Sequence, residues 1–236
     1  MQNKIEWIFF DCMETLVDMT ELPSPRDYAA WAYYGSGTEK LFGSFEEFYI
    51  LYDKAKKDID SSLEKCREYE FSRRLQLAAQ YAAGNSLEEN EHTKELLYSN
   101  YWKNYSERCY VRQDILETLP LLKKEYRLGV VSNFMVSGGI EELLEENGIM
   151  HYFDFVVTSI KEGWRKPHIN IYDAALKLSG SGYEKILFVG DDYENDYSAP
   201  KTLGMSAVLL DRYGRNKETN RRIADFYELM EMSKGL

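Results

Sequence analysis

The chain contains five short, mainly apolar runs, each with the length of a buried strand. The runs cover Ile5 to Phe10, Leu128 to Val131, Phe155 to Val157, Ile186 to Val189 and Ala207 to Leu210. Helix-length segments separate the last four runs, and Gly148 and Gly204 stand where a glycine commonly ends a helix. Because strand and helix alternate, the sequence predicts an α/β fold with a Rossmann-like parallel sheet.

The stretch over residues 18–106 interrupts this alternation, because it shows helical spacing without strand-length runs. Four aromatic residues follow the i, i+3, i+4, i+7 spacing of one helix face: Phe45, Phe48, Tyr49 and Tyr52. A similar stripe extends from Phe71 to Ala82. Such stripes usually form a packed core, so the sequence predicts an all-helical domain over residues 18–106. We expect it to be inserted into a core domain made of residues 1–17 and 107–236.

The overall charge is acidic, with 29 Lys and Arg against 40 Asp and Glu and a formal net charge of -11. This charge would repel nucleic acid phosphates and anionic membrane surfaces, which favours a small-molecule partner. Two basic pairs, Arg73-Arg74 and Arg221-Arg222, are short and stand among acidic residues. We interpret both as parts of solvated helix faces.

The three cysteines, Cys12, Cys66 and Cys109, are far apart and belong to no CxxC or histidine-rich motif. This spacing is unlike a disulfide framework or a zinc site and is typical of a reducing compartment. No apolar stretch has the length of a membrane span, and the first residues carry no signal-peptide cleavage pattern. We therefore expect a cytoplasmic protein; its oligomeric state stays open.

Polar residues follow four of the apolar runs directly. They are Asp11, Ser132-Asn133, Thr158-Ser159 and Gly190-Asp191-Asp192. Because ligands of an open parallel sheet bind outside the carboxyl ends of its strands, these side chains are expected to converge at one edge. Carboxylates from two strands suit Mg²⁺, which would also relieve their mutual repulsion. Each Asp or Ser alone could equally cap a helix, but capping does not explain the whole set.

Four motifs, in the same order, resemble those of the haloacid dehalogenase-like hydrolase superfamily. They are Ile8 to Leu16, Val130 to Asn133, Arg165-Lys166-Pro167 and Val189 to Asp196. Each motif is weak alone, but together they span nearly the whole chain. The insertion directly after the first motif matches the family's helical cap, whose opening and closing admits substrate and excludes water. The resemblance thus implies a cap that sets specificity.

The resemblance also implies a Mg²⁺-dependent phosphatase that acts on a small phosphorylated metabolite. Asp11 would attack phosphorus and form an aspartyl-phosphate. Ser132 would hydrogen-bond a phosphoryl oxygen, and Lys166 would neutralise charge on the transferring group. Asn133 is counted with them among the substrate-binding residues, and it would brace the loop together with Thr15.

The same resemblance implies the magnesium ligands. Asp11, Asp191 and the backbone carbonyl of Met13 would hold Mg²⁺ directly. Asp196 would bind the ion or orient its waters, and the resemblance leaves open whether Asp192 touches it.

Met13 departs from the family pattern, because phosphatases of the family carry a second aspartate two residues after the nucleophile. That aspartate protonates the leaving group and later activates water, and losing such a group typically costs ~10²–10⁴-fold in rate. Glu14 is adjacent, but glutamate also occurs there in family members that keep the second aspartate. A proton donor from the cap, or a substrate with a good leaving group such as an acyl phosphate, would resolve the loss.

Three alternatives follow from this departure. A catalytically weak chain could serve as a regulatory protein that binds phosphate and Mg²⁺. Haloacid dehalogenation needs no general acid, but those enzymes lack the acidic fourth motif that is present here. Phosphonate hydrolysis keeps Mg²⁺ but requires a Schiff-base lysine in the cap, and the lysines there read equally well as a solvated helix face.

Overall fold

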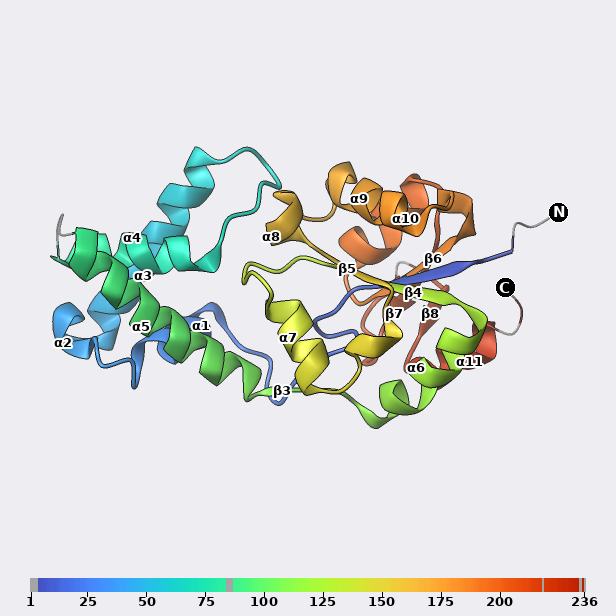
Figure 1. Cartoon of the computed structure of the whole chain (residues 1–236), viewed down its shortest axis with the longest axis horizontal. Coiled ribbons are helices and arrows are strands. Elements are labelled where there is room, and N and C mark those ends of the chain that lie inside the picture. Colours follow the sequence, from blue (N-terminus) through green and yellow to red (C-terminus); the bar gives the residue numbers. More distant parts are fainter. Residues whose placement is uncertain (1–3, 84–86, 218, 234, 236) are drawn as a thin grey trace. The chain divides into compact units, whose positions relative to one another are not determined.

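The computed structural model describes residues 4–83, 87–217, 219–233 and 235 (Figure 1). A six-stranded sheet forms the core of the larger of two units. Its strands are β1 (Trp7–Phe10), β4 (Arg127–Ser132), β5 (Phe155–Thr158), β6 (Ile186–Gly190), β7 (Ser206–Leu210) and β8 (Arg222–Ile223). The order is β5-β4-β1-β6-β7-β8, and each neighbouring pair is parallel. The predicted α/β fold and its five predicted strands are confirmed.

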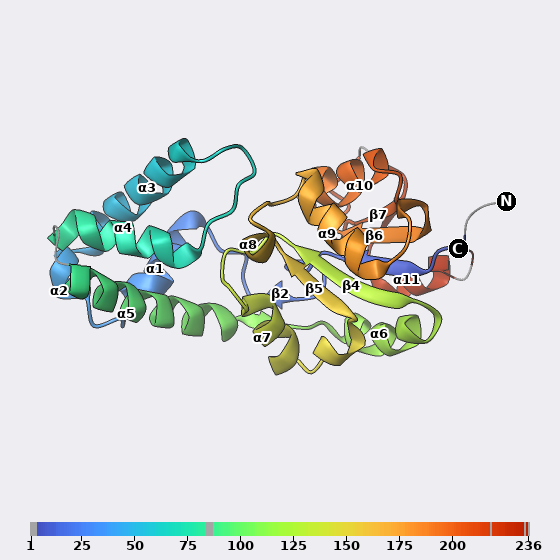
Figure 2. The ribbon, with the colours of Figure 1, turned by 45° about the horizontal axis from the view of Figure 1, so that its top comes forward.

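Helices cover both faces of this sheet. They are α6 (Gln113–Glu125), α7 (Gly139–Glu146), α8 (Ser159–Glu162), α9 (Ile169–Ser179), α10 (Ala199–Thr202) and α11 (Phe226–Ser233). Figures 1 and 2 show α9 and α10 on one face and α6 and α11 on the other. Two 3₁₀ helices, η1 and η2, span Met150–Tyr152 and Tyr183–Lys185, and a π-helix, η3, spans Tyr193–Ser198.

The apolar character of β1 follows from its central place between these two layers. Alternate residues of a strand point to opposite faces of the sheet, so a strand covered on both sides is apolar throughout. Phe9 belongs to the core cluster that includes Tyr172 of α9. Phe10 stacks on Phe226 of α11, with 5.7 Å between ring centroids. Both phenylalanines are fully buried.

The register brings the carboxyl ends of the central strands together. Phe10 is paired with Val130 of β4 and with Val189 of β6. The amide of Asp11 continues the ladder and donates to the carbonyl of Val189 at 2.9 Å. The polar residues that follow these three strands therefore share one edge of the sheet.

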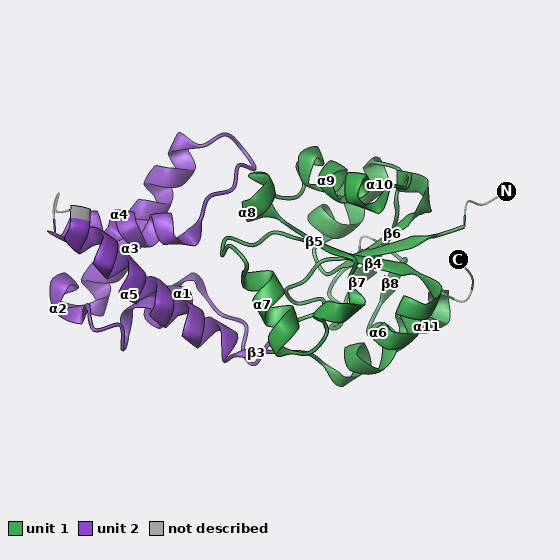
Figure 3. Ribbon diagram, viewed as in Figure 1, with its two compact units in different colours: residues 1–18, 110–236 green, residues 19–109 purple. Residues whose placement is uncertain are grey.

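The chain divides into two compact units, one made of residues 1–18 and 110–236 and the other of residues 19–109 (Figure 3). The sequence predicts these junctions after residues 17 and 106. The predicted ranges also include residues 1–3, 84–86, 218, 234 and 236, which lie outside the described part. Strands β2 (Asp18–Met19) and β3 (Cys109–Tyr110) form a two-stranded sheet where the chain passes between the units.

The second unit is helical in its described part. Its helices are α1 (Pro25–Tyr33), α2 (Glu39–Phe42), α3 (Phe45–Ser62), α4 (Phe71–Ala83) and α5 (Leu87–Ser106). Ser24 begins α1 with a capping box to Asp27, and Ser44 caps α3. Phe48 and Tyr52, from the predicted aromatic stripe, are fully buried and stacked. Among the described residues, no helix has both the length and the apolar character needed to cross a membrane.

The interpretation of the two basic pairs as solvated helix faces is confirmed for Arg73, which is exposed in α4, and is wrong for the other three residues. Arg221 and Arg222 are exposed, but neither lies in a helix. Arg74 is buried in α4, where its Nε donates to the Tyr52 carbonyl and its guanidinium lies 3.5 Å from the Tyr52 ring centroid. Arg222 lies in strand β8, and its Nη1 donates to Asp211 at 3.1 Å. Both guanidinium groups therefore have a structural partner that local sequence does not reveal.

Candidate active site

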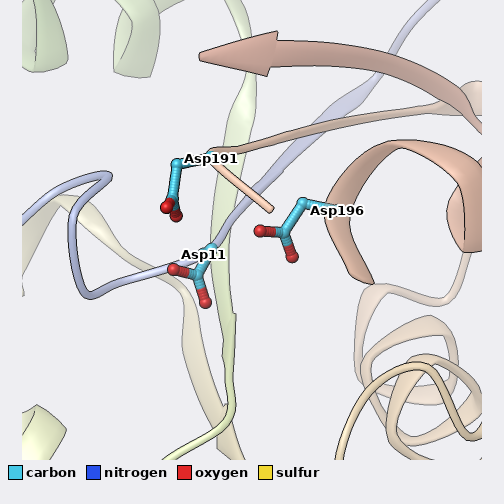
Figure 4. A group of neighbouring side chains, drawn as sticks. All are labelled: Asp11, Asp191 and Asp196. Carbon is cyan, nitrogen blue, oxygen red and sulfur yellow. The ribbon is translucent and has the colours of Figure 1, made fainter. Parts of the chain in front are cut away.

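Three aspartates converge at the carboxyl edge of the sheet. Asp11 follows β1, Asp191 follows β6, and Asp196 belongs to the π-helix η3. Their carboxylates point toward one another (Figure 4), and one oxygen of each lies within 4.8 Å of the others. Carboxylate oxygens are the ligands that Mg²⁺ prefers, so this donor set fits a magnesium ion.

Lys166 pairs with two of these three aspartates. Its ammonium donates to Asp11 Oδ1 and to Asp196 Oδ1, each at 2.7 Å, and its side chain is 2% exposed. Burying such a charge costs several kcal/mol unless it is paired. The two carboxylates supply that pairing and fix the ammonium beside the oxygen atoms of Asp11.

Asn133 holds Lys166 in place through its backbone. The Asn133 side chain accepts from the Lys166 amide at 2.7 Å and donates to the Lys166 carbonyl at 3.1 Å. Both ends of the Asn133 amide are therefore engaged by one residue of the neighbouring loop. These two hydrogen bonds join Asn133 to the loop of Lys166, and the part of Asn133 in substrate binding stays a prediction.

The crowded carboxylates change the proton affinities of the site. Burial raises the pKa of Asp191, and the charges of Asp11 and Asp196 raise it further. Burial also raises the pKa of Asp196, although Lys166 opposes that effect. Burial disfavours the charged form of Lys166, but Asp11 and Asp196 outweigh it and hold the pKa of the ammonium above its ordinary value. One ammonium cannot neutralise three carboxylates, so the cluster favours an added cation.

Two buried hydroxyl groups border this cluster. Ser132 ends β4 and is 1% exposed, and its Oγ has no hydrogen-bond partner among the described residues. An unpaired buried hydroxyl costs about 1–3 kcal/mol, so a ligand oxygen that accepts a hydrogen bond from Ser132 would be stabilised there. Thr15 is fully buried, and its Oγ1 donates to Asp191 Oδ1 at 3.2 Å.

The Thr158-Ser159 pair lies at the carboxyl end of β5. Ser159 accepts from the Phe134 amide at 2.8 Å and so braces the loop that follows Ser132 and Asn133. The Thr158 hydroxyl is buried and has no partner in the described part of the chain.

The remaining motif residues lie outside the buried carboxylate group. Met13 is half-buried and carries only a thioether, and its carbonyl stays a predicted ligand. Asp192 is exposed and accepts from the Asn195 amide at 2.7 Å, which makes it the cap of η3. Glu14 has a positive φ of 60°. Partial loss of solvent around its carboxyl, together with the negative charges of Asp11 and Asp18, raises the pKa of that group.

Similarity to known proteins identifies the family. The family model described as haloacid dehalogenase-like hydrolase matches residues 38–210, which is more than half of the chain. The chain belongs to this family. The resemblance that the four motifs indicated is therefore confirmed, and the inserted helical unit is consistent with a cap.

Two curated relatives of this haloacid dehalogenase-like hydrolase match parts of the chain. A haloacid dehalogenase-like hydrolase domain-containing protein 3 from Xenopus laevis is 43% identical over 84 residues, which are 36% of this chain and 34% of the relative. A glyceraldehyde 3-phosphate phosphatase from Methanothermobacter thermautotrophicus is 40% identical over 92 residues, 39% of this chain and 40% of the relative. The matches thus span well under two thirds of these relatives.

A solved structure matches nearly the whole hydrolase chain. It is a 2-haloacid dehalogenase from Pseudomonas syringae pv. Tomato, with a TM-score of 0.76 at 19% identity, covering 96% of this chain and 97% of that one. At this level of identity the likeness shows the fold alone.

Two residues near the site have structural roles that the motifs do not assign. Gly190 leaves room for Asp196, because a Cβ atom at Gly190 would lie 2.4 Å from the Asp196 carboxyl carbon. Arg212, two residues after β7, donates from Nη2 to the Thr15 carbonyl at 2.9 Å. The place of Gly190 directly before Asp191 hints at its steric role, whereas nothing local to Arg212 predicts a contact with residue 15.

Proposed function

We propose that this chain is a Mg²⁺-dependent phosphatase that acts on a small phosphorylated metabolite through Asp11. One observation carries the proposal: a buried lysine bridges Asp11 and Asp196 while Asp191 completes a group of three carboxylates. This arrangement joins a nucleophile, a fixed positive charge and oxygen ligands for a cation, the parts that phosphoryl transfer requires. A relative that is a glyceraldehyde 3-phosphate phosphatase supports the same class of substrate.

Asp11 would form a bond from a carboxylate oxygen to phosphorus while the bond from phosphorus to the leaving oxygen breaks. The electron pair of the broken bond stays on the leaving group, and water later attacks the aspartyl-phosphate to release phosphate and restore Asp11. Lys166 would offset negative charge on Asp11 and on the phosphoryl oxygens. The unpartnered Ser132 hydroxyl would donate to one of those oxygens.

Asp11 and Asp191 would hold Mg²⁺, which supplies positive charge that shields the nucleophile from the anionic substrate. Both oxygens of Asp196 already accept hydrogen bonds, from Lys166 and from the Asp192 amide at 3.1 Å. We therefore assign Asp196 mainly to orienting Lys166 and water near the ion, and keep the Met13 carbonyl as a further proposed ligand. We also propose a cytoplasmic location, which the isolated cysteines support.

Met13 restricts the substrates that this site can process. Because a thioether cannot protonate a leaving alcohol, substrates whose leaving group departs unprotonated are favoured, and acyl phosphates are of this kind. The same residue favours a second candidate function, a weakly active protein that binds phosphate and Mg²⁺ for regulation.

Steady-state assays of the full chain with and without Mg²⁺ test the proposal. The substrates are acetyl phosphate, p-nitrophenyl phosphate and a panel of sugar and nucleotide phosphates. We expect Mg²⁺-dependent phosphate release that is greatest for acetyl phosphate and is lost in Asp11→Asn, because the amide is not a nucleophile. Asp60→Asn, at an exposed ion pair of α3, serves as the matched control and should keep activity.

Absence of Asp11-dependent turnover on every substrate would reject the phosphatase. Calorimetric binding of Mg²⁺ and inorganic phosphate by such an inactive chain would then support the regulatory alternative.

A further inference from the structure

Arg212 is a buried cation that the proposed reaction does not use. It lies in the loop after β7, at the same edge of the sheet as the three aspartates, and its side chain is 9% exposed. Within the described part of the chain, its Nε and Nη1 atoms have no hydrogen-bond partner. Removing a guanidinium from water carries a desolvation cost, and interactions with neighbouring groups must offset that cost.

The hydrogen bond of this guanidinium goes to the loop that follows the nucleophile. Nη2 donates to the Thr15 carbonyl at 2.9 Å. The carboxylates of Asp18 and Asp114 stand farther off, at 3.8 and 3.9 Å, and balance the charge without a hydrogen bond. Arg112 shares both of these carboxylates, at 3.7 and 3.4 Å. Arg212 therefore differs from Arg112 by its contact with Thr15.

Thr15 connects this contact to the carboxylate group. Its amide donates to the Cys12 carbonyl at 3.2 Å, and its carbonyl accepts from Arg212, so the residue is held on both sides. Its hydroxyl donates to Asp191 Oδ1 at 3.2 Å. Among the described residues, no other group donates a hydrogen bond to the Asp191 side chain. The direction of the Asp191 carboxylate thus depends on where the Thr15 backbone lies.

We infer that Arg212 is a positioning residue of the metal site: it fixes the Thr15 carbonyl and thereby directs the Thr15 hydroxyl to Asp191. A metal-binding carboxylate that is held by a hydrogen bond loses less freedom when the ion binds, and such outer partners commonly set affinity. Lysine cannot replace this function fully, because its single ammonium cannot offset two carboxylates and bind the Thr15 carbonyl from separate nitrogen atoms, as Nη1 and Nη2 of Arg212 do. The inference rests on the proposed function only in that Asp191 holds Mg²⁺.

Calorimetric titration of the full chain with Mg²⁺ alone, without substrate, tests the inference. We expect Arg212→Lys to raise the Kd for Mg²⁺ and Arg212→Met to raise it further, by roughly 10-fold. The midpoint of thermal unfolding is measured for each variant, and titrations are run well below it, so that loss of folding is not read as loss of binding.

Arg112→Met is the matched control, because it removes a cation from the same two carboxylates without touching Thr15. It should leave the Kd for Mg²⁺ close to that of the wild type. Thr15→Val should weaken Mg²⁺ binding by itself, and adding Arg212→Lys to it should cost little more, because both act through one hydroxyl.

Wild-type Kd values in folded Arg212→Lys and Arg212→Met would overturn the inference, as would an equal loss in Arg112→Met or full additivity with Thr15→Val. A wild-type chain that binds no Mg²⁺ would reject both this inference and the proposed metal site. Mg²⁺ binding with the expected variant pattern but no phosphate release would reject only the proposed reaction.

Discussion

We propose that Met13 limits which leaving groups the site can process, because it stands two residues after Asp11 and offers no proton. We predict that Met13→Asp raises kcat/KM for sugar and alkyl phosphates by roughly 10²-fold, within the usual contribution of a positioned general acid. The gain for acetyl phosphate should be much smaller, since its leaving carboxylate needs no proton. Steady-state kinetics on both substrate types measure the difference.

Met13→Leu serves as the control for this change, because it alters shape without adding a proton donor, and it should give no gain. No gain in Met13→Asp would show that another group already protonates the leaving oxygen. An equal gain on both substrate types would show that the new carboxylate acts on a step common to both and not on the leaving group.

At the residue scale, the sequence predicts the members of the site better than their contacts. Asp11, Lys166 and Asp191 follow from motifs, and the structure brings them together. The contact of Arg212 with Thr15 joins positions 197 residues apart, and neither residue's neighbours in sequence reveal it. Arg74 is a similar case. A charged residue on an amphipathic helix is expected in solvent, but the structure places the Tyr52 ring and carbonyl beside its guanidinium.

At the element scale, two strand glycines are required for different reasons. A Cβ atom at Gly190 would lie 2.4 Å from the Asp196 carboxyl carbon, and one at Gly129 would lie 2.4 Å from the Phe155 ring. We predict that Gly190→Ala and Gly129→Ala each lower the free energy of unfolding by about 1–3 kcal/mol through overpacking. Denaturant titration measures this loss.

Magnesium binding separates the two glycine variants. Gly190→Ala should also raise the Kd for Mg²⁺ by about 10-fold, because it displaces Asp196 from the carboxylate group. Gly129→Ala should leave the Kd unchanged. Wild-type affinity in Gly190→Ala, or a matching loss in Gly129→Ala, would contradict the steric role assigned to Gly190.

The strands that the sequence predicts are those with a continuous apolar run, since burial on both faces demands one. β8 escapes prediction because it has two residues, Arg222 and Ile223, and its place is set by backbone pairing with β7. The π-helix η3 is likewise not predicted, because its segment is polar and has no apolar periodicity. Asp192 at its start is nevertheless a typical helix cap. Short elements of this kind depend on their tertiary neighbours more than on local pattern.

At the scale of the whole molecule, the predicted site chemistry lies in one of the two units. The chain has a net charge of -11, and three of its carboxylates gather at one site, where a buried lysine pairs with two of them. The larger unit alone contains the four motifs and all seven of the predicted site residues. That the helical unit sets substrate specificity stays a prediction. Of its aromatic residues, Phe48 and Tyr52 are buried in the core of that unit.

The central claim is that Asp11 becomes phosphorylated during turnover, and Met13 makes this observable. Without a residue to activate water, the aspartyl-phosphate should clear slowly and accumulate. The direct measurement is mass spectrometry of peptides from full-chain protein that is mixed with acetyl phosphate and Mg²⁺ and quenched in acid. We predict one phosphoryl group on the peptide that contains Asp11, removed by hydroxylamine and absent in Asp11→Asn. Phosphate release with no adduct, or with an adduct at another residue, would contradict the account.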